Sequence, residues 1–299
     1  IDNSIDEISV KEGKIIILDS VAKEMQNQEH LIEESSEDNY PEKKKSEIKS
    51  ASYKTESSGR GSVESDKINQ SSQSTQSASN NFNYSKTQSS SQRSQRSPSP
   101  GQQAEMNEAV GYFEEKSPNS FEYHYFKYVS GNYDVSLFSH LSKAEKLRAN
   151  NTDVHVQMAA YHIIQSNKIE ALAYVEKLIK SKRLSESVLN YAEDILLSAP
   201  KNGTLITHGF DDSYATWYLQ AKRNIRTDVR LISLDFMQSE YYRSEIKKKG
   251  YQLPNSANID VNYFENFCKL NSSNKISASL TMPKEYFKPI MNSVYVVGL

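Results

Sequence analysis

The segment 208–213 reads His-Gly-Phe-Asp-Asp-Ser and carries the residue types best suited to chemistry in this chain. The imidazole of His208 can act as an acid or a base near neutral pH. Asp211 and Asp212 can hold a hard cation through their carboxylate oxygens, although the sequence does not identify a metal. The candidate ligand-binding residues are His208, Gly209, Asp211, Asp212, Ser213 and Asp235.

Helix capping is the competing role for these residues, and it is the favoured interpretation. Asp212 or Ser213 can cap a helix that begins at Tyr214, since Asp and Ser are preferred N-cap residues. Asp235 can in the same way cap a helix that follows Met237. Ligand binding at this segment is the alternative.

The elements around the segment alternate between strand and helix. β-prone runs at 204–207 and 229–234 are each followed by a helical pattern, the first from Tyr214 and the second over 239–249. This alternation predicts a Rossmann-like βαβα domain with a parallel sheet over 201–299. Loops at the carboxyl ends of parallel strands supply ligands, so Asp235 should lie beside the segment 208–213. Further candidates are a helix at 263–270, a strand at 275–282, a helix at 283–290 and a strand at 293–299.

Residues 209–230 resemble a bacterial family of multispanning proteins similar to protein O-mannosyltransferases. That family has Gly-Asp-Asn-Asp-Thr, an aromatic residue and Pro-Leu-Trp-Tyr, then Arg-x-Asp-Val-Arg before a strand. The matching residues are Gly209, Asp212, Ser213 in place of Thr, Tyr214, Trp217, Tyr218, Arg226, Asp228, Val229 and Arg230. Phe210 replaces the first Asp of the family and Asp211 replaces its Asn. The resemblance covers the last third of the chain and implies an extracytoplasmic, envelope-associated setting, in the periplasm or at the outer membrane.

Three charged residues of this stretch have a predicted structural role. Arg226, Asp228 and Arg230 alternate beside the second strand, and we expect them to form an ion-pair and turn set at its start.

A helical module is predicted over 106–200. Helical patterns occur at 137–147, 154–165, 169–179 and 187–197. Leu141 and Val175 lie 34 residues apart, which is the period of the tetratricopeptide repeat, and Gly131-x-Tyr133 is its usual turn signal. About two such units are visible, and a generic stack of α-hairpins is the alternative. This module is the expected site of protein partners.

The N-terminal third has a different composition. Residues 33–105 are rich in Ser, Gln, Asn and charged residues, and such a segment cannot bury enough apolar surface to fold. We therefore expect a long disordered linker. Residues 1–32 contain a possible strand at 14–18 and a helix-like segment at 20–32, interpreted as the tail of a preceding domain or as a docking peptide.

Composition and motifs exclude several classes of protein. The net charge of −2 gives no general attraction to nucleic acid, and the single cysteine, Cys268, excludes an internal disulfide. His124, His140, His155 and His162 are scattered over separate predicted helices, without the spacing of a zinc protease. The three-glycine dinucleotide pattern, the phosphate loop and Gly-x-Ser-x-Gly are all missing, so no cofactor is expected.

The ends of the chain and its apolar runs bear on its setting. No apolar run approaches the roughly 18 residues that a membrane span needs. The chain begins without Met, so a signal peptide or lipid anchor could precede it, and it ends just after a strand-like run, as a truncated domain would.

The sequence therefore predicts a non-catalytic interaction or scaffold component of a bacterial envelope assembly for secretion or surface glycosylation. The alternative is an enzyme, or enzyme subunit, that acts on a sugar or nucleotide-sugar at the segment 208–213.

Overall fold

The computed structural model describes residues 15–19, 74–84, 86 and 96–298. These residues are mostly helical and contain a parallel β-sheet. Residues 15–19 and 79–298 belong to one compact unit, and residues 74–78 belong to a second. The first unit contains the sheet and all of the candidate residues.

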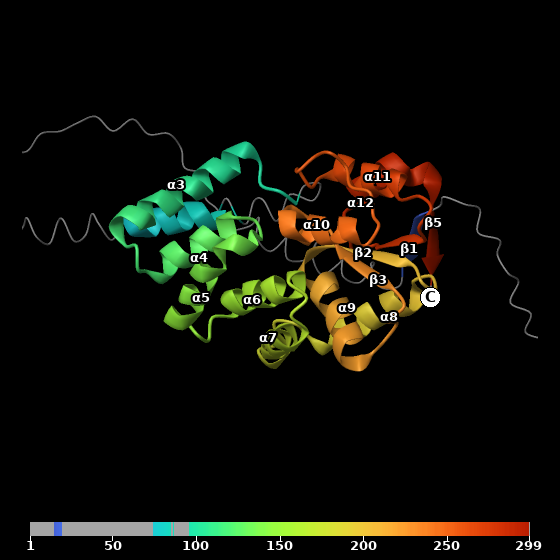
Figure 1. The fold of residues 1–299 in the computed structure, drawn as a ribbon, viewed down its shortest axis with the longest axis horizontal. Helices are drawn as coiled ribbons and strands as arrows, with labels where there is room; N and C mark the ends of the chain where they lie inside the picture. Colours follow the sequence, from blue (N-terminus) through green and yellow to red (C-terminus); the bar gives the residue numbers. More distant parts are fainter. Residues whose placement is uncertain (1–14, 20–73, 85, 87–95, 299) are drawn as a thin grey trace, which may run out of the picture. The chain divides into compact units, whose positions relative to one another are not determined.

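The sheet is parallel throughout, and its strand order is β3-β2-β4-β1-β5 (Figure 1). Its strands are β1 (Ile15–Asp19), β2 (Thr204–Thr207), β3 (Arg230–Ser233), β4 (Ile276–Ser279) and β5 (Val294–Gly298). Each strand that the sequence predicts is present. β2 has the predicted bounds, and β3 and β4 are shorter than predicted because their ends turn toward the following helices.

β1 corrects the interpretation of residues 1–32 as a tail of another domain. Ile16 lies in register with Ser277 of β4 on one side and with Tyr295 of β5 on the other. The N-terminal strand is therefore an interior strand of this sheet. The signal was present in the sequence, because a continuous apolar run such as Ile15 to Leu18 is typical of a central parallel strand.

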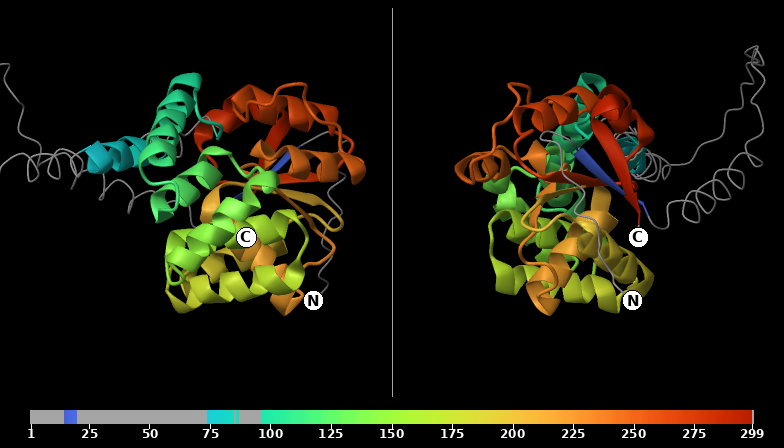
Figure 2. Two further views of the ribbon diagram at one scale, coloured as in Figure 1. Left: turned by 60° about the vertical axis from the view of Figure 1, so that its left-hand side comes forward. Right: turned by 90° about the vertical axis from the view of Figure 1, so that its right-hand side faces the viewer.

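Helices cover both faces of the sheet. α8 (Glu186–Ser198) and α9 (Gly209–Arg223) lie on one face, and α10 (Glu240–Lys248), α11 (Val261–Leu270) and the short α12 (Lys284–Phe287) lie on the other (Figures 1 and 2). Successive side chains of a strand point to opposite faces. Leu205 and Ile206 of β2 are both fully buried, so both faces are covered at the centre of the sheet.

The region before the sheet is helical, as predicted. It contains α3 (Pro100–Lys116), α4 (Phe121–Ser130), α5 (Phe138–Leu147), α6 (Thr152–Ile164) and α7 (Lys168–Lys180). Leu141 of α5 and Val175 of α7 are both 0% exposed, as their 34-residue spacing predicts. The tetratricopeptide interpretation and the Rossmann-like classification stay predictions.

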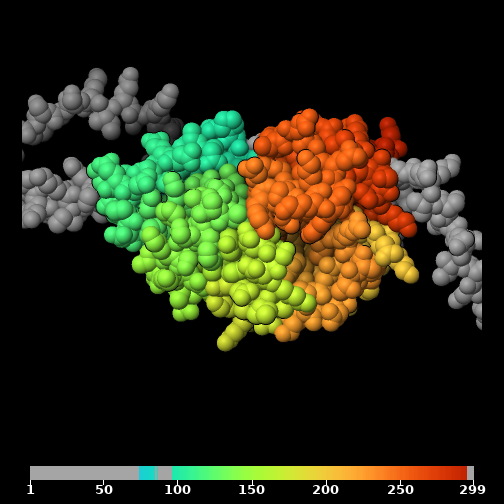
Figure 3. Space-filling view, viewed as in Figure 1, coloured from blue at the N-terminus to red at the C-terminus, as the bar shows by residue number. Residues whose placement is uncertain are grey.

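The helical region packs directly against the α/β region. The Tyr214 hydroxyl of α9 donates a hydrogen bond to the Val156 carbonyl of α6 at 3.0 Å, and Tyr133 contacts Phe236 edge-to-face at 5.4 Å. Figure 3 shows green and orange side chains meeting along this boundary. The boundary expected near residue 200 is therefore a turn inside one compact unit.

The C-terminal end of the predicted disordered linker is ordered, which corrects that prediction. Residues 79–84 are helical, and Phe82 stacks on Phe126 with ring centroids 3.9 Å apart. Ser99 and Gln102 form a capping box that starts α3 at Pro100. Most of the predicted linker, and the predicted helix at 20–32, lie outside the described residues.

Arg226 joins the helical region to the sheet. Its guanidinium donates to the carbonyls of Leu196, Leu197 and Pro200 at 2.9, 3.0 and 3.2 Å. The same group donates to both carboxylate oxygens of Asp228 at 2.9 and 3.1 Å, as the predicted ion-pair set requires. Arg226 thus binds two carbonyls in the last turn of α8 and the Pro200 carbonyl just after it.

Replacing Arg226 with Ala is expected to lower the free energy of unfolding by about 2 kcal/mol, because several charged hydrogen bonds are lost at once. Arg230 is the matched control. The predicted set includes it, but its side chain is exposed and makes no hydrogen bond or ion pair with the described residues, while its backbone N–H donates to the Gly203 carbonyl at 2.9 Å. Urea denaturation of Arg230→Ala should agree with the parent to within about 0.5 kcal/mol. If the two variants lost the same free energy of unfolding, Arg226 would not stabilise the contact between the helical region and the sheet.

Candidate functional site

The candidate residues lie at the carboxyl edge of the sheet, where strand order changes direction. In the sheet, β3 lies on one side of β2 and β4 lies on the other. After β3 the chain therefore crosses back past β2 to form β4. Ligands of open α/β sheets bind at such a switch point, outside the carboxyl ends of the strands. His208 follows β2, Asp235 follows β3 and Thr281 follows β4, so three strands bring polar side chains to this edge.

The segment 208–213 is not a loop. α9 begins at Gly209, and His208 is the N-cap residue, without a capping hydrogen bond from its side chain. Gly209 has a φ of +74°, a conformation that glycine adopts without strain, and this allows the chain to turn directly from β2 into the helix. Asp211 in the first turn favours a helix start because its carboxylate places negative charge at the positive end of the helix dipole.

Neither Asp212 nor Ser213 caps the helix, which corrects the favoured interpretation. Asp212 is 3% exposed, and its carboxylate accepts a hydrogen bond from the Thr281 hydroxyl. Burial raises the pKa of Asp212 to about 7, and hydrogen bonds from the Thr281 and Ser279 hydroxyls and the His208 backbone oppose this shift only in part. The Ser213 hydroxyl bonds the hydroxyls of Thr207 and Ser233, both at 2.9 Å. Ser213 therefore ties α9 to β2 and β3, and Asp212 ties it to the turn after β4.

Asp235 is held by two groups of this chain. One carboxylate oxygen accepts a hydrogen bond from the Gly209 N–H at 2.6 Å, and the other pairs with the Arg96 guanidinium at 3.4 Å. The Arg96 and Asp235 side chains are only 7% and 17% exposed. Lys86 lies within electrostatic range, and burial lowers its pKa despite the attraction of Asp235. Asp235 caps no helix, because Ser239 caps α10.

Among the described residues at this edge, His208 has an unsatisfied polar atom, as Tyr286 does at its hydroxyl. Its Nε2 is buried and has no hydrogen-bond partner among the described residues. Burial lowers the pKa of His208 to about 4, so the ring is neutral at physiological pH. Its ring meets that of the fully buried Tyr286 at a centroid distance of 6.0 Å. A neutral imidazole can accept or donate one further hydrogen bond at Nε2.

Asp211 faces a different environment from Asp212. Its half-exposed carboxylate lies 3.9 Å from Arg183, whose guanidinium stacks over the Phe210 ring at 4.1 Å. The sequence predicts that Asp211 and Asp212 could bind the same cation. In the structure the two carboxylates have different partners. Within the described part of the chain, no group of three or more His, Cys, Asp or Glu side chains is arranged to hold a metal ion.

Four residues of this edge, Lys86, Arg96, Thr281 and Tyr286, were not predicted as site residues. They come from segments far from β2 along the chain, and no local pattern marks them.

A second unpredicted contact joins two of the scattered histidines. His124 of α4 and His140 of α5 lie with their Nδ1 atoms 3.0 Å apart.

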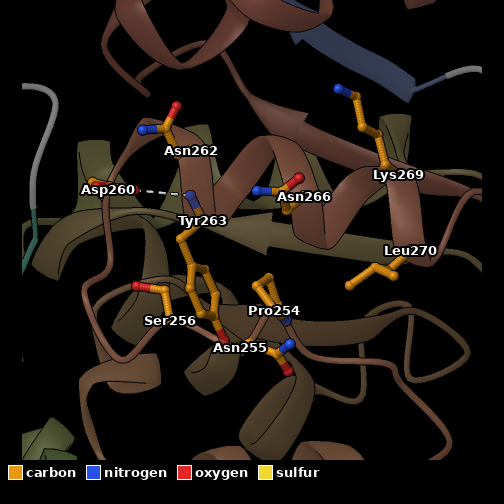
Figure 4. Close-up of a pocket in the computed structure, with 9 residues that line it drawn as sticks. All are labelled: Pro254, Asn255, Ser256, Asp260, Asn262, Tyr263, Asn266, Lys269 and Leu270. Atoms are coloured by element: carbon orange, nitrogen blue, oxygen red, sulfur yellow. Dashed lines mark hydrogen bonds between the residues drawn. The ribbon is translucent and has the colours of Figure 1, made fainter.

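A surface groove of about 600 Å³ lies away from this edge, beside α11 (Figure 4). Its lining residues are Pro254, Asn255, Ser256, Asp260, Asn262, Tyr263, Asn266, Lys269 and Leu270. Most of these residues are polar and exposed. No pattern in the sequence predicts this groove, since its walls meet only after α11 folds back along the segment before it.

Residues 188–293 match the family model described as TMEM260-associated domain 2. The match begins in α8 and includes the candidate residues at the sheet edge and the groove beside α11. It overlaps the stretch that resembles proteins similar to O-mannosyltransferases, and no bacterial family is part of it. No curated protein and no solved structure matches the chain. Among the described residues, no helix has both the length and the apolar character to cross a membrane.

Proposed function

We propose that this chain is a non-catalytic interaction component of a bacterial envelope assembly that serves secretion or surface glycosylation. Its sheet domain resembles the soluble region of multispanning proteins similar to O-mannosyltransferases, and residues 188–293 match a domain associated with TMEM260. An extracytoplasmic position beside a membrane enzyme suits both findings. The chain would recognise a protein and hold it near that enzyme.

The observation that carries this proposal is the occupation of the sheet edge by the chain itself. In α/β enzymes the N–H groups at the start of the first helix face the ligand and bind its anionic groups. Here the Gly209 N–H binds Asp235, and Arg96 closes the other side of that carboxylate. A substrate anion would have to displace a buried, paired carboxylate. This arrangement supports a structural role for the edge.

The helical region supplies the partner surface in this proposal, whether its two hairpins α4–α5 and α6–α7 are tetratricopeptide units or a generic stack. Large apolar side chains are exposed on its helices. Ile169 of α7 is 80% exposed, Leu147 of α5 is 51% exposed and Leu197 of α8 is 53% exposed. A contiguous exposed apolar patch marks a protein interaction site, and Ile169, the most exposed of the three, is the test position.

A second candidate function is an enzyme that acts on a sugar or nucleotide-sugar at the sheet edge. The observation that favours it is the buried Nε2 of His208, which has no hydrogen-bond partner among the described residues and lies at the strand-order switch. A buried polar atom without a partner is uncommon and is often found at functional sites. In this candidate function, Arg96 must leave the edge before substrate binds.

The two candidate functions predict opposite results for two variants of the full-length protein. Ile169→Asp places a charge in the proposed partner surface and should reduce the amount of assembly by at least about tenfold. His208→Ala should leave both assembly and surface glycosylation unchanged. Native gels of membranes extracted in mild detergent measure the assembly, and glycan content of the envelope measures the activity.

Met291→Asp is the matched control, because Met291 is an apolar residue of the α/β region that is 63% exposed. This variant should behave as the parent does. Loss of glycosylation in His208→Ala with an intact assembly would overturn the non-catalytic proposal in favour of the enzyme. Assembly retained in Ile169→Asp would overturn the role given to the helical surface.

A further inference from the structure

Two histidines face each other between neighbouring helices of the helical region. The Nδ1 atoms of His124 in α4 and His140 in α5 lie 3.0 Å apart, which is hydrogen-bonding distance. The two rings are inclined to each other by 63° and do not stack. The Nε2 atom of each ring makes no hydrogen bond with the described residues. The contact between the two helices at this point therefore runs through the two Nδ1 atoms.

The number of protons on the pair decides whether this contact is attractive. When both rings are neutral, one donates from Nδ1 while the other carries its proton on Nε2 and accepts at Nδ1. One added proton leaves this bond in place, because the charged ring still donates to the neutral ring, and a charge-assisted bond is the stronger kind. A second added proton puts an N–H on both of the facing Nδ1 atoms. Two donors and two positive charges then oppose each other, and the rings must separate.

The groups around the pair disfavour the second proton. Burial is the largest cause that lowers the pKa of both histidines. The charge of Lys143 on α5 lowers both pKa values further, and that of Lys127 on α4 lowers the pKa of His140. Glu114 of α3 opposes these lysines at His140, and its carboxylate accepts the Tyr123 hydroxyl at 2.8 Å. Among the described residues, no group of α6, which also packs on α5, contributes to either shift.

The pair lies beside buried packing on both helices. Next to His140 in the chain is Leu141, which is 0% exposed. Next to His124 is the buried Tyr123, whose ring contacts both histidine rings at centroid distances of 5.0 and 5.4 Å. Separation of the two histidines therefore disturbs packed side chains on α4 and on α5, and it loosens the hairpin that these helices form.

We propose that the His124–His140 pair forms a pH-sensitive contact between α4 and α5, which joins the helices with at most one added proton and separates them when both rings are charged. The direction of the effect follows from proton uptake. Histidines of an unfolded chain take up protons near pH 6.5, and the folded pair takes up its second proton at a lower pH. The stability that this contact supplies is therefore complete above about pH 6.5 and falls as the pH falls below that value. The proposal does not depend on the interaction function, and its test needs no partner protein.

Nuclear magnetic resonance of the full chain, labelled with ¹⁵N at histidine, tests the proton count directly. EDTA is present throughout, so that trace metal does not bind the rings. At pH 7.5 one ring of the pair should carry its proton on Nδ1 and the other on Nε2. On acidification the pair should titrate in two steps separated by at least about one pH unit, as interacting groups do. Protons on Nε2 of both rings at pH 7.5, or a single titration step, would overturn the proposal.

His140→Asn separates the effect of charge from the effect of packing. The Asn amide lies near the position of Nδ1 and can bond His124 whether that ring is neutral or charged. Hydrogen exchange of the amides of α4 and α5, corrected for its intrinsic pH dependence, measures how firmly the hairpin is closed. From pH 7.5 to pH 5, protection in the parent should fall at least about tenfold further than in His140→Asn, since one unit of pKa difference is a factor of ten.

His155→Gln is the matched control. The His155 Nε2 of α6 donates to the Ala149 carbonyl at 2.8 Å, a bond that a Gln amide can keep, and this ring does not belong to the pair. Protection of α4 and α5 in His155→Gln should fall in acid as it does in the parent. Equal loss of protection in the parent and in His140→Asn would show that the pair does not respond to pH, and would refute the proposal.

Discussion

Replacing Asp235 with Ala is expected to lower the free energy of unfolding by about 4 kcal/mol, the usual cost of breaking a buried ion pair from one side. The Arg96 guanidinium, 7% exposed, would keep its charge without its carboxylate. The Gly209 N–H would lose its acceptor at the start of α9. Lys86 lies close enough to interact with the same carboxylate, so the positive form of Lys86 would also be less favourable without it.

Asp211→Ala is the matched control, because Asp211 also pairs with an arginine near the same edge. Its partner Arg183 lies 3.9 Å away, and the two side chains are 49% and 45% exposed. A pair exposed to this degree contributes about 1 kcal/mol or less. Urea denaturation followed by the fluorescence of Trp217 measures both variants. Similar losses in the two would show that the Arg96–Asp235 pair is open to solvent.

A double variant tests whether the loss comes from the stranded charge. Arg96→Met in the Asp235→Ala background removes the uncompensated guanidinium and should recover part of the stability, because isosteric apolar replacement of a buried pair is often nearly neutral. No recovery would mean that the cost arises mainly from the Gly209 N–H.

The elements that position this edge follow from local patterns in the sequence. Apolar runs predict β2 and β3, and helical periodicity predicts the helices that follow them. His208 and Asp235 follow neighbouring parallel strands, so their meeting at one edge could be predicted. The Gly209 N–H then binds Asp235 across 26 residues of chain.

The partners that close the edge could not be predicted in this way. Arg96 reaches Asp235 across 139 residues, and Thr281 reaches Asp212 across 69. No periodicity links residues so far apart. The adjacent aspartates also have the composition of a helix cap, which is why Asp212 was assigned to the helix start. Only tertiary packing distinguishes a carboxylate that caps a helix from one that is buried against a neighbouring loop.

Asp212 makes the stability of the protein depend on pH. Burial raises its pKa to about 7, compared with about 3.9 for an aspartate in an unfolded chain. Between these values the folded protein retains a proton that the unfolded chain has released. The contribution of Asp212 to the free energy of unfolding therefore falls as pH rises, by up to about 1.4 kcal/mol per unit, and stops falling above the folded pKa.

Asp212→Asn should remove this slope. The Asn carbonyl can still accept the Thr281 hydroxyl, and the side chain has no charge to bury. From pH 5 to pH 8 the variant is expected to gain roughly 3 kcal/mol of stability relative to the parent, because about two pH units of the window lie in that range.

Asp153→Asn, at an exposed position of α6, is the control and should leave the slope unchanged. Other titrating groups, histidines included, are common to parent and variant and cancel in the difference. Parallel stability curves for Asp212→Asn and the parent would show that Asp212 is ionised in the folded protein throughout, and that its environment is more polar than its burial implies.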